Sequence, residues 1–385
     1  MSRSDCITSS SPNDFGISGY SNLPNHRTTT KNQEIGHIHG MAQAAIAPLL
    51  DIFKPTRKEN VIGNLRQTGN VNALRCCQAI AELAGVSAQE VLPFSTGVIG
   101  EHLPVEKILA AAPTVFADLS ESSWVEAAEG ILTTDTRPKL VSVQLEIGGK
   151  QVSITGIAKG SGMIKPNMAT MLSFIFTDAD IESTVLDEFL HDAVEKSFNR
   201  ITVDGDTSTN DCCMLVATGK SDVSINKLST HDYCQFKAAL ESLFITLATE
   251  LIKDAEGASK FITITVASGA SSLECRRVAY SIAESPLVKT ALFAEDPNWG
   301  RILAAVGRSG LENLDLQSIT IDLGSVRIVS GGGVDPSYLE EMGQVAMQKD
   351  EIIISVSLNR GNFSESVWTS DLSHEYISIN SDYRT

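Results

Sequence analysis

A loop of small residues that runs into an apolar segment carries the clearest potential for chemistry in this sequence. Residues 156–172 read GIAKGSGMIKPNMATML, and the apolar run continues to Thr177. Such a run is typical of a buried central strand, so Thr170 is expected at its start, directly after the small residue Ala169. A hydroxyl in this place suits a nucleophile that attacks the carbonyl before it: the peptide becomes an ester, and water then releases a new amino terminus. The freed α-amine, with a pKa of about 8, would serve as the base for its own hydroxyl.

Negative charge develops on the attacked carbonyl oxygen, so this chemistry requires hydrogen-bond donors and a cation nearby. Lys159 could supply the cation. Residues 94–100 (FSTGVIG) read as a strand end that turns through glycine, where backbone N–H groups and the Thr96 hydroxyl could form an oxyanion hole. Each segment also has a non-catalytic interpretation. Residues 156–172 could be a loop with Lys159 on its rim, and residues 94–100 could contain an ordinary Thr-Gly turn.

A third polar segment, residues 202–211 (TVDGDTSTND), is dense in side-chain oxygens and bounded by apolar strands. A turn built on Asp and Asn side chains and a calcium loop are both compatible with this composition. The spacing and the terminal Glu of an EF-hand loop are missing. We therefore predict an internally hydrogen-bonded turn that buttresses a site.

Other familiar chemistries lack their motifs. The sequence contains no phosphate-binding G-x-x-x-x-G-K-[ST] segment and no dinucleotide-binding G-x-G-x-x-G after a strand. Its cysteines occur as the adjacent pairs Cys76-Cys77 and Cys212-Cys213, never as C-x-x-C, and its histidines form no H-x-x-x-H. A G-x-S-x-G partner for a histidine is also missing. We predict no metal, no cofactor and no His-dependent nucleophile.

Amino-acid composition and net charge limit the classes of binding partner and the cellular compartment that we expect for this chain. The chain has 385 residues, of which 42% are hydrophobic, so it can bury a sizeable core. Its net charge of −17 argues against binding to nucleic acid or to an anionic membrane surface, because phosphate groups would repel it. No apolar run approaches the roughly 18 residues of a membrane span. Seven cysteines, an odd number, argue against a disulfide scaffold and favour a reducing, cytoplasmic compartment.

Strands and helices are expected to alternate irregularly, which favours an α+β layered sandwich. Residues 1–40 are rich in Ser, Thr and Asn, and residues 1–60 are expected to form an atypical, partly disordered arm. The pattern predicts helices over 76–84, 230–254, 271–284, 300–307 and 336–348, a hairpin over 143–154, and strands over 171–177, 261–266, 318–323, 326–329 and 351–358. Residues 376–379 read as a strand and 380–385 as a polar tail.

Seven segments, taken together and in order, resemble one known family. They read STGVIGEHLP, TTDTRPK, AKGSGMIKPNMATML, TVDGDTSTND, DAEGASK, EDPNWGRI and DLSHEYISINSDYRT. In combination they are similar to ornithine acetyltransferase, also called glutamate N-acetyltransferase, from about Gly69 to Thr385. The resemblance implies an N-terminal-nucleophile-like layered sandwich and self-cleavage between Ala169 and Thr170. The chain would then divide into an atypical arm (1–60), an α chain (61–169) and a β chain (170–385), with two copies of each cleaved chain in a heterotetramer.

The resemblance also implies roles for individual residues. Thr170 would carry the acetyl group, and Thr96 and Gly97 would stabilise the oxyanion. Contacts with the substrate would come from Thr133, Lys159, Thr170, Glu256, Asn380 and Thr385. A carboxylate such as Glu256 and a cation such as Lys159 suit an amino acid that carries a second amine.

The implied reaction belongs to arginine biosynthesis. N2-acetylornithine would acetylate Thr170 and release ornithine, and glutamate would then take the acetyl group in a ping-pong cycle. Acetyl-CoA is a second donor in the bifunctional members, and its use stays open here. Two alternatives also stay open: an amidase or aminopeptidase in which water accepts the acyl group, and an uncleaved, inactive homologue.

Overall fold

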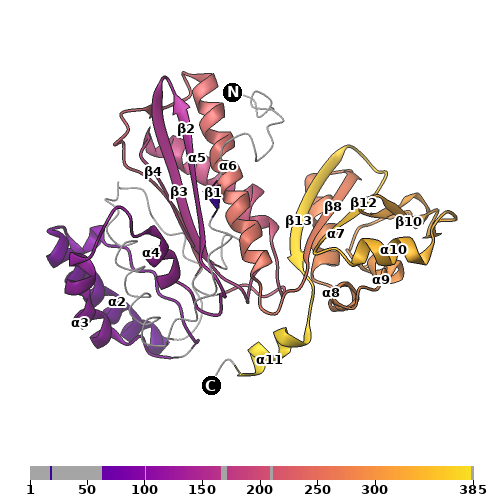
Figure 1. Ribbon diagram of the computed structural model, residues 1–385, viewed down its shortest axis with the longest axis horizontal. Helices are drawn as coiled ribbons and strands as arrows, with labels where there is room; N and C mark the ends of the chain where they lie inside the picture. The colour runs from indigo at the N-terminus through magenta and orange to yellow at the C-terminus, as the bar shows by residue number, and fades with distance from the viewer. Residues whose placement is uncertain (1–17, 20–62, 100, 166–170, 209–210, 383–385) are drawn as a thin grey trace. The chain divides into compact units, whose positions relative to one another are not determined.

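The computed structural model describes residues 18–19, 63–99, 101–165, 171–208 and 211–382 (Figure 1). These residues form two compact units that interleave along the sequence. Unit 1 comprises Met1–Gly160, Met168–Ser197 and Thr209–Leu247, and unit 2 comprises Ser161–Asn167, Phe198–Ser208 and Ala248–Thr385. Most of the expected N-terminal arm, the expected cleavage point at Ala169–Thr170 and the last residue, Thr385, lie outside the described residues.

The centre of unit 1 is a five-stranded sheet with the order β1-β2-β3-β4-β6. Its strands are β1 (Ser18–Gly19), β2 (Lys139–Ile147), β3 (Lys150–Lys159), β4 (Leu172–Thr177) and β6 (Cys212–Ala217). The predicted hairpin is confirmed: β2 and β3 pair antiparallel around Gly148 and Gly149, both with positive φ. The predicted buried strand is β4, which pairs antiparallel with β3 and parallel with β6.

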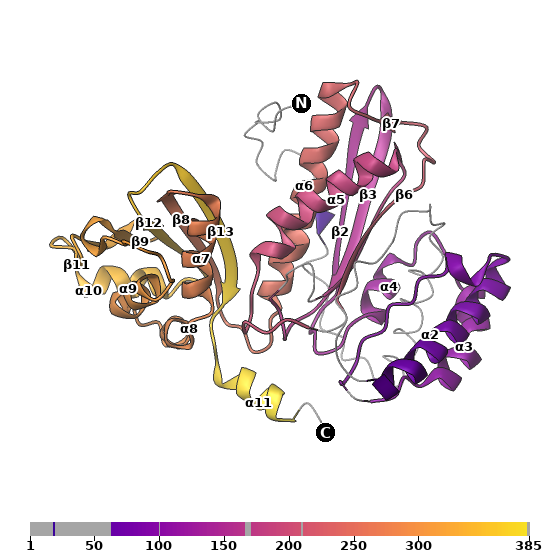
Figure 2. The same ribbon diagram turned by 180° about the vertical axis from the view of Figure 1, so that it is seen from behind.

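Helices cover both faces of this sheet. On one face, Ala127 and Ala128 of α4 pack against Ile157 of β3 and its neighbours. On the other face, Gly156 lies against Leu243 of α6, where a Cβ would be crowded. Because adjacent residues of a strand point to opposite sides, the sheet lies between α4 and α6, and Figure 2 shows α5 beside α6. The remaining elements of unit 1 are α2 (Gly63–Ala84), η3 (Ala88–Glu90), α3 (Val105–Ala117), α4 (Trp124–Gly130), β5 (Asp180–Ile181), α5 (Ser183–Lys196), β7 (Ser224–Ile225) and α6 (Thr230–Lys253, whose last turns belong to unit 2).

Unit 2 is built on a six-stranded sheet with the order β11-β10-β9-β12-β8-β13, in which only β8 and β12 run parallel to each other. Ile352 and Ile354 of β12 are buried beneath helices, whereas Ile353 between them is half exposed. The elements are η4 (Phe198–Arg200), β8 (Phe261–Gly269), α7 (Ser272–Ala283), α8 (Pro286–Phe293), α9 (Trp299–Gly307), η5 (Leu316–Ser318), β9 (Thr320–Leu323), β10 (Val326–Ser330), β11 (Gly333–Val334), α10 (Glu340–Met347), β12 (Glu351–Ser357), β13 (Phe363–Ser370) and α11 (His374–Asp382).

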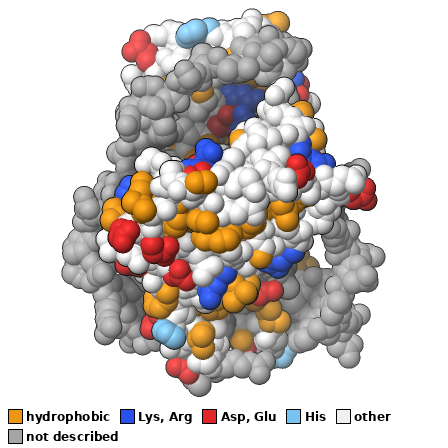
Figure 3. Space-filling view, turned by 90° about the vertical axis from the view of Figure 1, so that its right-hand side faces the viewer, with side chains coloured by type: hydrophobic (Ala, Val, Ile, Leu, Met, Phe, Trp, Pro, Cys, Tyr) orange, Lys and Arg blue, Asp and Glu red, His pale blue; other side chains and the backbone are white. Residues whose placement is uncertain are grey.

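The helix α10 packs closely against its neighbours at a glycine, and some of its apolar side chains are exposed. A Cβ at Gly343 would collide with Tyr338 and Pro297, so this position permits the close approach of the helix. Met347 is buried, while Met342 and Val345 are exposed. Figure 3 shows hydrophobic side chains gathered on the side of the molecule to which α10 belongs.

The structure confirms the expected α+β organisation and all five predicted helices, although α2 starts well before residue 76. Two local predictions are wrong. Residues 376–379 belong to the helix α11, because Ser373 caps it: the Ser373 Oγ accepts hydrogen bonds from the N–H groups of Glu375 (3.1 Å) and Tyr376 (3.3 Å). Residues 94–99 form an irregular loop rather than a strand end, after Pro93 has removed one backbone donor.

Candidate functional site

In unit 1, the structure brings the predicted residues Lys159 and Thr96 together. Lys159 is the last residue of β3, its side chain is largely buried, and its Nζ donates a hydrogen bond of 3.2 Å to Thr96 Oγ1. Burial lowers the pKa of the Lys159 ammonium, while Asp135 and Asp211 act in the opposite direction. Because the Thr96 hydroxyl accepts from a cation, its own proton stays available to a second acceptor.

Lys159 also lies beside the beginning of the central strand. In the β3–β4 pairing, Lys159 is opposite Leu172, and Leu172 pairs on its other side with Cys212 of β6. Leu172 follows Thr170 by two residues in the sequence. Thr170 lies outside the described residues, but the register pairs Lys159 with Leu172, the second residue after it.

A buried carboxylate that the sequence analysis did not single out organises this region. Asp135 accepts hydrogen bonds from Lys139 Nζ (2.5 Å), the Gly160 N–H (2.6 Å) and the Thr133 N–H (3.1 Å). The side chains of Asp135 and Lys139 are completely buried. Burial alone would raise the pKa of Asp135, but Lys139, the Gly160 N–H and Lys159 together hold it below its ordinary value.

This carboxylate connects two predicted site residues, Thr133 and Lys159. It fixes the backbone of Thr133, it binds the residue after Lys159, and its charge acts on the Lys159 ammonium. A Cβ at Gly97, the predicted partner of Thr96, would meet no atom of the described residues within 4 Å. The signal that could have revealed Asp135 is its position four residues before Lys139 in the segment TTDTRPK.

In unit 2, the structure brings together two predicted substrate contacts, Glu256 and Asn380. The Asn380 Nδ2 donates a hydrogen bond of 2.7 Å to Glu256 Oε2, and the Glu256 side chain is largely buried. The Glu256 N–H donates to the Ser161 carbonyl at 2.9 Å. A Cβ at Gly162 would collide with the Glu256 carboxylate, so only glycine fits there without moving that group.

Asp204 forms the predicted internally hydrogen-bonded turn, which is therefore confirmed. Its carboxylate accepts hydrogen bonds from the N–H groups of Met163 (2.7 Å), Ile164 (3.1 Å) and Asp206 (3.1 Å), and from the Tyr376 hydroxyl (3.2 Å). Burial raises the pKa of Asp204. Met163 has a φ of 53°, a strained value for a non-glycine residue, and the carboxylate holds it there. Asp204 thus ties the loop 161–165 to the helix α11.

The segment that leads into α11 is anchored by two further buried charges. Asp371 accepts hydrogen bonds from the Ser259 N–H (2.9 Å) and hydroxyl (2.6 Å) and from the Lys260 N–H (3.0 Å). The Lys289 Nζ donates to Thr369 Oγ1 at 2.9 Å and to the Ser370 carbonyl. Burial lowers the pKa of Lys289 to about 8.

Comparison with known proteins identifies the family. A family model described as the ArgJ family matches residues 61–385. The chain belongs to the ArgJ family. It is 51% identical over 346 residues to the arginine biosynthesis bifunctional protein ArgJ of Pseudomonas fluorescens, covering 87% of this chain and 85% of that protein. The protein of the same name from Psychrobacter arcticus is 51% identical over 368 residues, which cover 93% of this chain and 88% of that protein.

A solved structure agrees with this ArgJ-family assignment. The crystal structure of the arginine biosynthesis bifunctional protein ArgJ from Bacillus halodurans matches with a TM-score of 0.53 and 37% sequence identity. The match covers 55% of this chain and 99% of the solved chain. Together with the mixed helices and sheets, it identifies the fold as the α+β, N-terminal-nucleophile-type fold of the family.

For this ArgJ-family chain, no cluster of His, Cys, Asp and Glu able to hold a metal ion occurs among the described residues. Cys76, Cys77, Cys212, Cys213 and Cys275 are free thiols. Within the same described ranges, no helix is both long and apolar enough to cross a membrane.

Proposed function

We propose that this ArgJ-family acetyltransferase of arginine biosynthesis cleaves itself between Ala169 and Thr170 and then carries the acetyl group on Thr170. The observation that supports the proposal best is the Lys159–Thr96 pair, because Lys159 lies opposite Leu172 at the start of β4. A buried cation and a hydroxyl at the beginning of this strand suit a reaction that generates an oxyanion there.

Cleavage would use the Thr170 hydroxyl as its nucleophile. Thr170 Oγ1 attacks the Ala169 carbonyl carbon, the C–N bond breaks as the amine takes a proton, and an ester remains. Water then hydrolyses the ester, which leaves a carboxylate on Ala169 and a free amine on Thr170. The Thr96 hydroxyl and the Gly97 N–H would donate to the oxyanion of each tetrahedral intermediate.

Acetyl transfer would reuse the same groups. The Thr170 hydroxyl attacks the acetyl carbonyl of N2-acetylornithine, while its α-amine takes the hydroxyl proton and passes it to the departing ornithine amine. Glutamate then attacks the acetyl ester with its own amine and restores the hydroxyl. Lys159 would contribute positive charge and takes no part in bond making. Burial lowers the pKa of its ammonium group, and the charges of Asp135 and Asp211 act against this lowering.

Substrate contacts are proposed from the chemistry of individual residues. Glu256 is a largely buried carboxylate that suits the side-chain ammonium of ornithine, and Asn380 fixes its orientation. Thr133, oriented through Asp135, and Thr385 would supply neutral hydrogen bonds. We also propose a cytoplasmic enzyme without a cofactor, with two α and two β chains and with acetyl-CoA as a second donor, since its relatives are named bifunctional.

A paired measurement tests the proposal. Purified protein should give fragments of 169 and 216 residues, and it should form N-acetylglutamate from N2-acetylornithine and glutamate. Release of acetate without N-acetylglutamate would identify a hydrolase. An intact chain with no transferase activity would identify an inactive homologue.

A further inference from the structure

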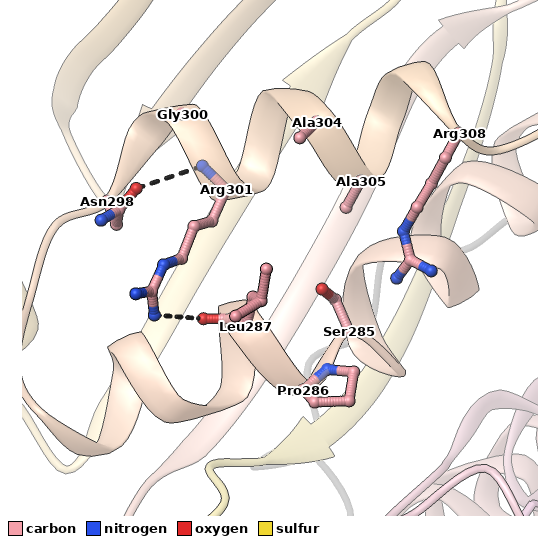
Figure 4. A pocket seen from close by; sticks show the side chains of 9 residues that line it. All are labelled: Ser285, Pro286, Leu287, Asn298, Gly300, Arg301, Ala304, Ala305 and Arg308. Carbon is pink, nitrogen blue, oxygen red and sulfur yellow. Dashed lines mark hydrogen bonds between the residues drawn. The ribbon is translucent and has the colours of Figure 1, made fainter.

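Unit 2 contains a pocket that includes none of the residues proposed for acetyl transfer. It lies between α8 and α9 and has a volume of about 420 Å³. The segment EDPNWGRI, to which the acetyl-transfer chemistry assigns no role, forms part of its wall through Asn298, Gly300 and Arg301. Figure 4 shows that α9 spans the pocket, with Leu287 and Pro286 of α8 opposite it.

Arg301 of α9 and Arg308, the residue that directly follows the last residue of α9, lie at the two ends of this pocket. Arg301 and Arg308 are seven residues apart, which is about two helical turns and about 10 Å along the axis, so they lie on the same face. Figure 4 shows both side chains extending from α9 to the side where α8 lies. Between them the helix presents only Ala304 and Ala305, which leave room for a ligand along its surface.

Neither guanidinium is paired with a carboxylate among the described residues. Arg301 Nη1 donates to the Leu287 carbonyl (2.9 Å) and to Thr290 Oγ1 (3.4 Å), and Arg308 Nη2 donates to the Ser281 carbonyl (3.0 Å). Other arginines of unit 2 do contact acids: Arg200 with Glu365, Arg327 with Asp322, and Arg360 with Glu274. A guanidinium has five N–H donors, so both pocket arginines retain donors for an external acceptor.

The start of α8 adds positive potential to the same pocket. Ser285 caps this helix and lines the pocket, with its Oγ accepting from the Val288 N–H at 3.5 Å. The first turn of a helix carries a partial positive charge. Two acidic residues stand close to the lining residues in the sequence, and both have partners: Asp296 accepts a hydrogen bond of 2.9 Å from the Asn298 amide, and Glu284 forms an ion pair of 2.9 Å with Lys165.

We propose that this pocket binds a short organic dicarboxylate. One carboxylate binds Arg301, the other binds Arg308, and the carbon chain lies over Ala304 and against Leu287. Guanidinium groups bind carboxylates through two parallel N–H···O bonds, and the two positions on one helix face set the separation of the two acid groups. The proposal does not depend on the cleavage or acetyl-transfer chemistry.

Calorimetric titration of the full chain with glutarate, a plain dicarboxylate, tests this site. Glutarate should bind saturably, and butyrate, with one carboxylate, should bind at least about tenfold more weakly, since it leaves one arginine without charge-assisted hydrogen bonds to the ligand. Arg301→Gln and Arg308→Gln should each weaken glutarate binding by about the same factor. Arg327→Gln, an exposed arginine of the same unit outside the pocket, should leave it unchanged.

A second variant keeps the test decisive if either arginine variant fails to fold. Ala304 is exposed, so Ala304→Leu should fold and should block the pocket floor. Loss of glutarate binding in Ala304→Leu supports the site. If glutarate still binds to Ala304→Leu and to the double variant Arg301→Gln/Arg308→Gln, it binds at another site, such as the glutamate site. That result overturns the proposal. Equal affinity for glutarate and butyrate, or no saturable binding, also overturns it.

Discussion

The Asn380 Nδ2 amide donates a hydrogen bond of 2.7 Å to Glu256 Oε2, so the helix α11 holds a largely buried carboxylate that follows α6 in the sequence. A carboxylate held by an amide keeps one orientation, with its other oxygen available to a ligand. The C-terminal helix is therefore part of the proposed binding machinery rather than a dispensable tail.

Asn380→Ala should impair substrate binding and leave self-cleavage intact. Loss of a hydrogen bond to a charged group costs roughly 1.5–3 kcal/mol, so KM for N2-acetylornithine should rise by on the order of tenfold or more. Steady-state kinetics on the processed protein give KM and kcat separately. Ser378→Ala is a matched control, because the Ser378 hydroxyl donates its hydrogen bond to the His374 carbonyl of the same helix.

A truncation extends this test to the end of the chain. Without residues 381–385, the fragments should still form, but acetyl transfer should fall severely through weaker amino-acid binding. Wild-type kinetics in this truncation would remove Thr385 from the site, and an unchanged KM in Asn380→Ala would remove Asn380.

Thr96→Ala should act on the transition state. The Thr96 hydroxyl accepts a hydrogen bond of 3.2 Å from Lys159, and the proposal makes this hydroxyl an oxyanion donor. Removal of one such donor typically lowers the rate by about 10²–10³, so kcat should fall by this order with little change in KM. Thr114→Ala, at an exposed threonine of α3, is the control. A change confined to KM would relocate Thr96 to substrate binding.

Asp135→Asn should destabilise the fold. It removes the carboxylate charge that pairs with the completely buried Lys139 ammonium, and breaking a buried pair in this way costs about 3–5 kcal/mol. Asp322→Asn breaks the exposed pair with Arg327 and should cost about 0–1 kcal/mol. Urea unfolding of both variants measures the difference. Equal, small losses would show that the buried pair contributes little.

Lys289 should make the free energy of unfolding change with pH in the alkaline range. Burial lowers its pKa to about 8, whereas the unfolded chain keeps the ordinary value of about 10.4, so between these values the unfolded state binds more protons. Stability contributed by this site should therefore rise with pH from about 8 to about 10. Asp371, Asp204 and Glu284 moderate the shift. The difference in unfolding free energy between wild type and Lys289→Met isolates the effect, and a pH-independent difference would contradict it.

Much of the fold could be predicted because local patterns and tertiary packing agree. The alternation of Val143, Leu145 and Ile147 around two glycines specifies the hairpin, and all three side chains are buried as expected. The strand expected over 376–379 failed for the opposite reason. Its Tyr-Ile-Ser-Ile alternation has no sheet partner among the described residues, whereas the upstream Ser373 supplies a helix cap.

The candidate site was predictable only in part. Lys159 and Thr96 could be named because small residues and glycines surround them, and the structure pairs them. Asp135 was missed because a sequence does not show that a charged residue is buried; a carboxylate four residues before a lysine usually belongs to a solvated surface pair. The cluster around Asp135 depends on contacts with Gly160, 25 residues away, which only the folded sheet creates.

Thr170→Ala tests the central claim most directly. One hydroxyl is proposed to serve both cleavage and acetyl transfer, so the intact mass of the purified variant should be that of the uncut 385-residue chain, with no N-acetylglutamate formed. The wild-type protein in the same measurement should give two fragments, the second of which begins with Thr170. Fragments cut between residues 169 and 170 in the purified Thr170→Ala protein, or acetyl transfer by the uncut variant, would contradict the account.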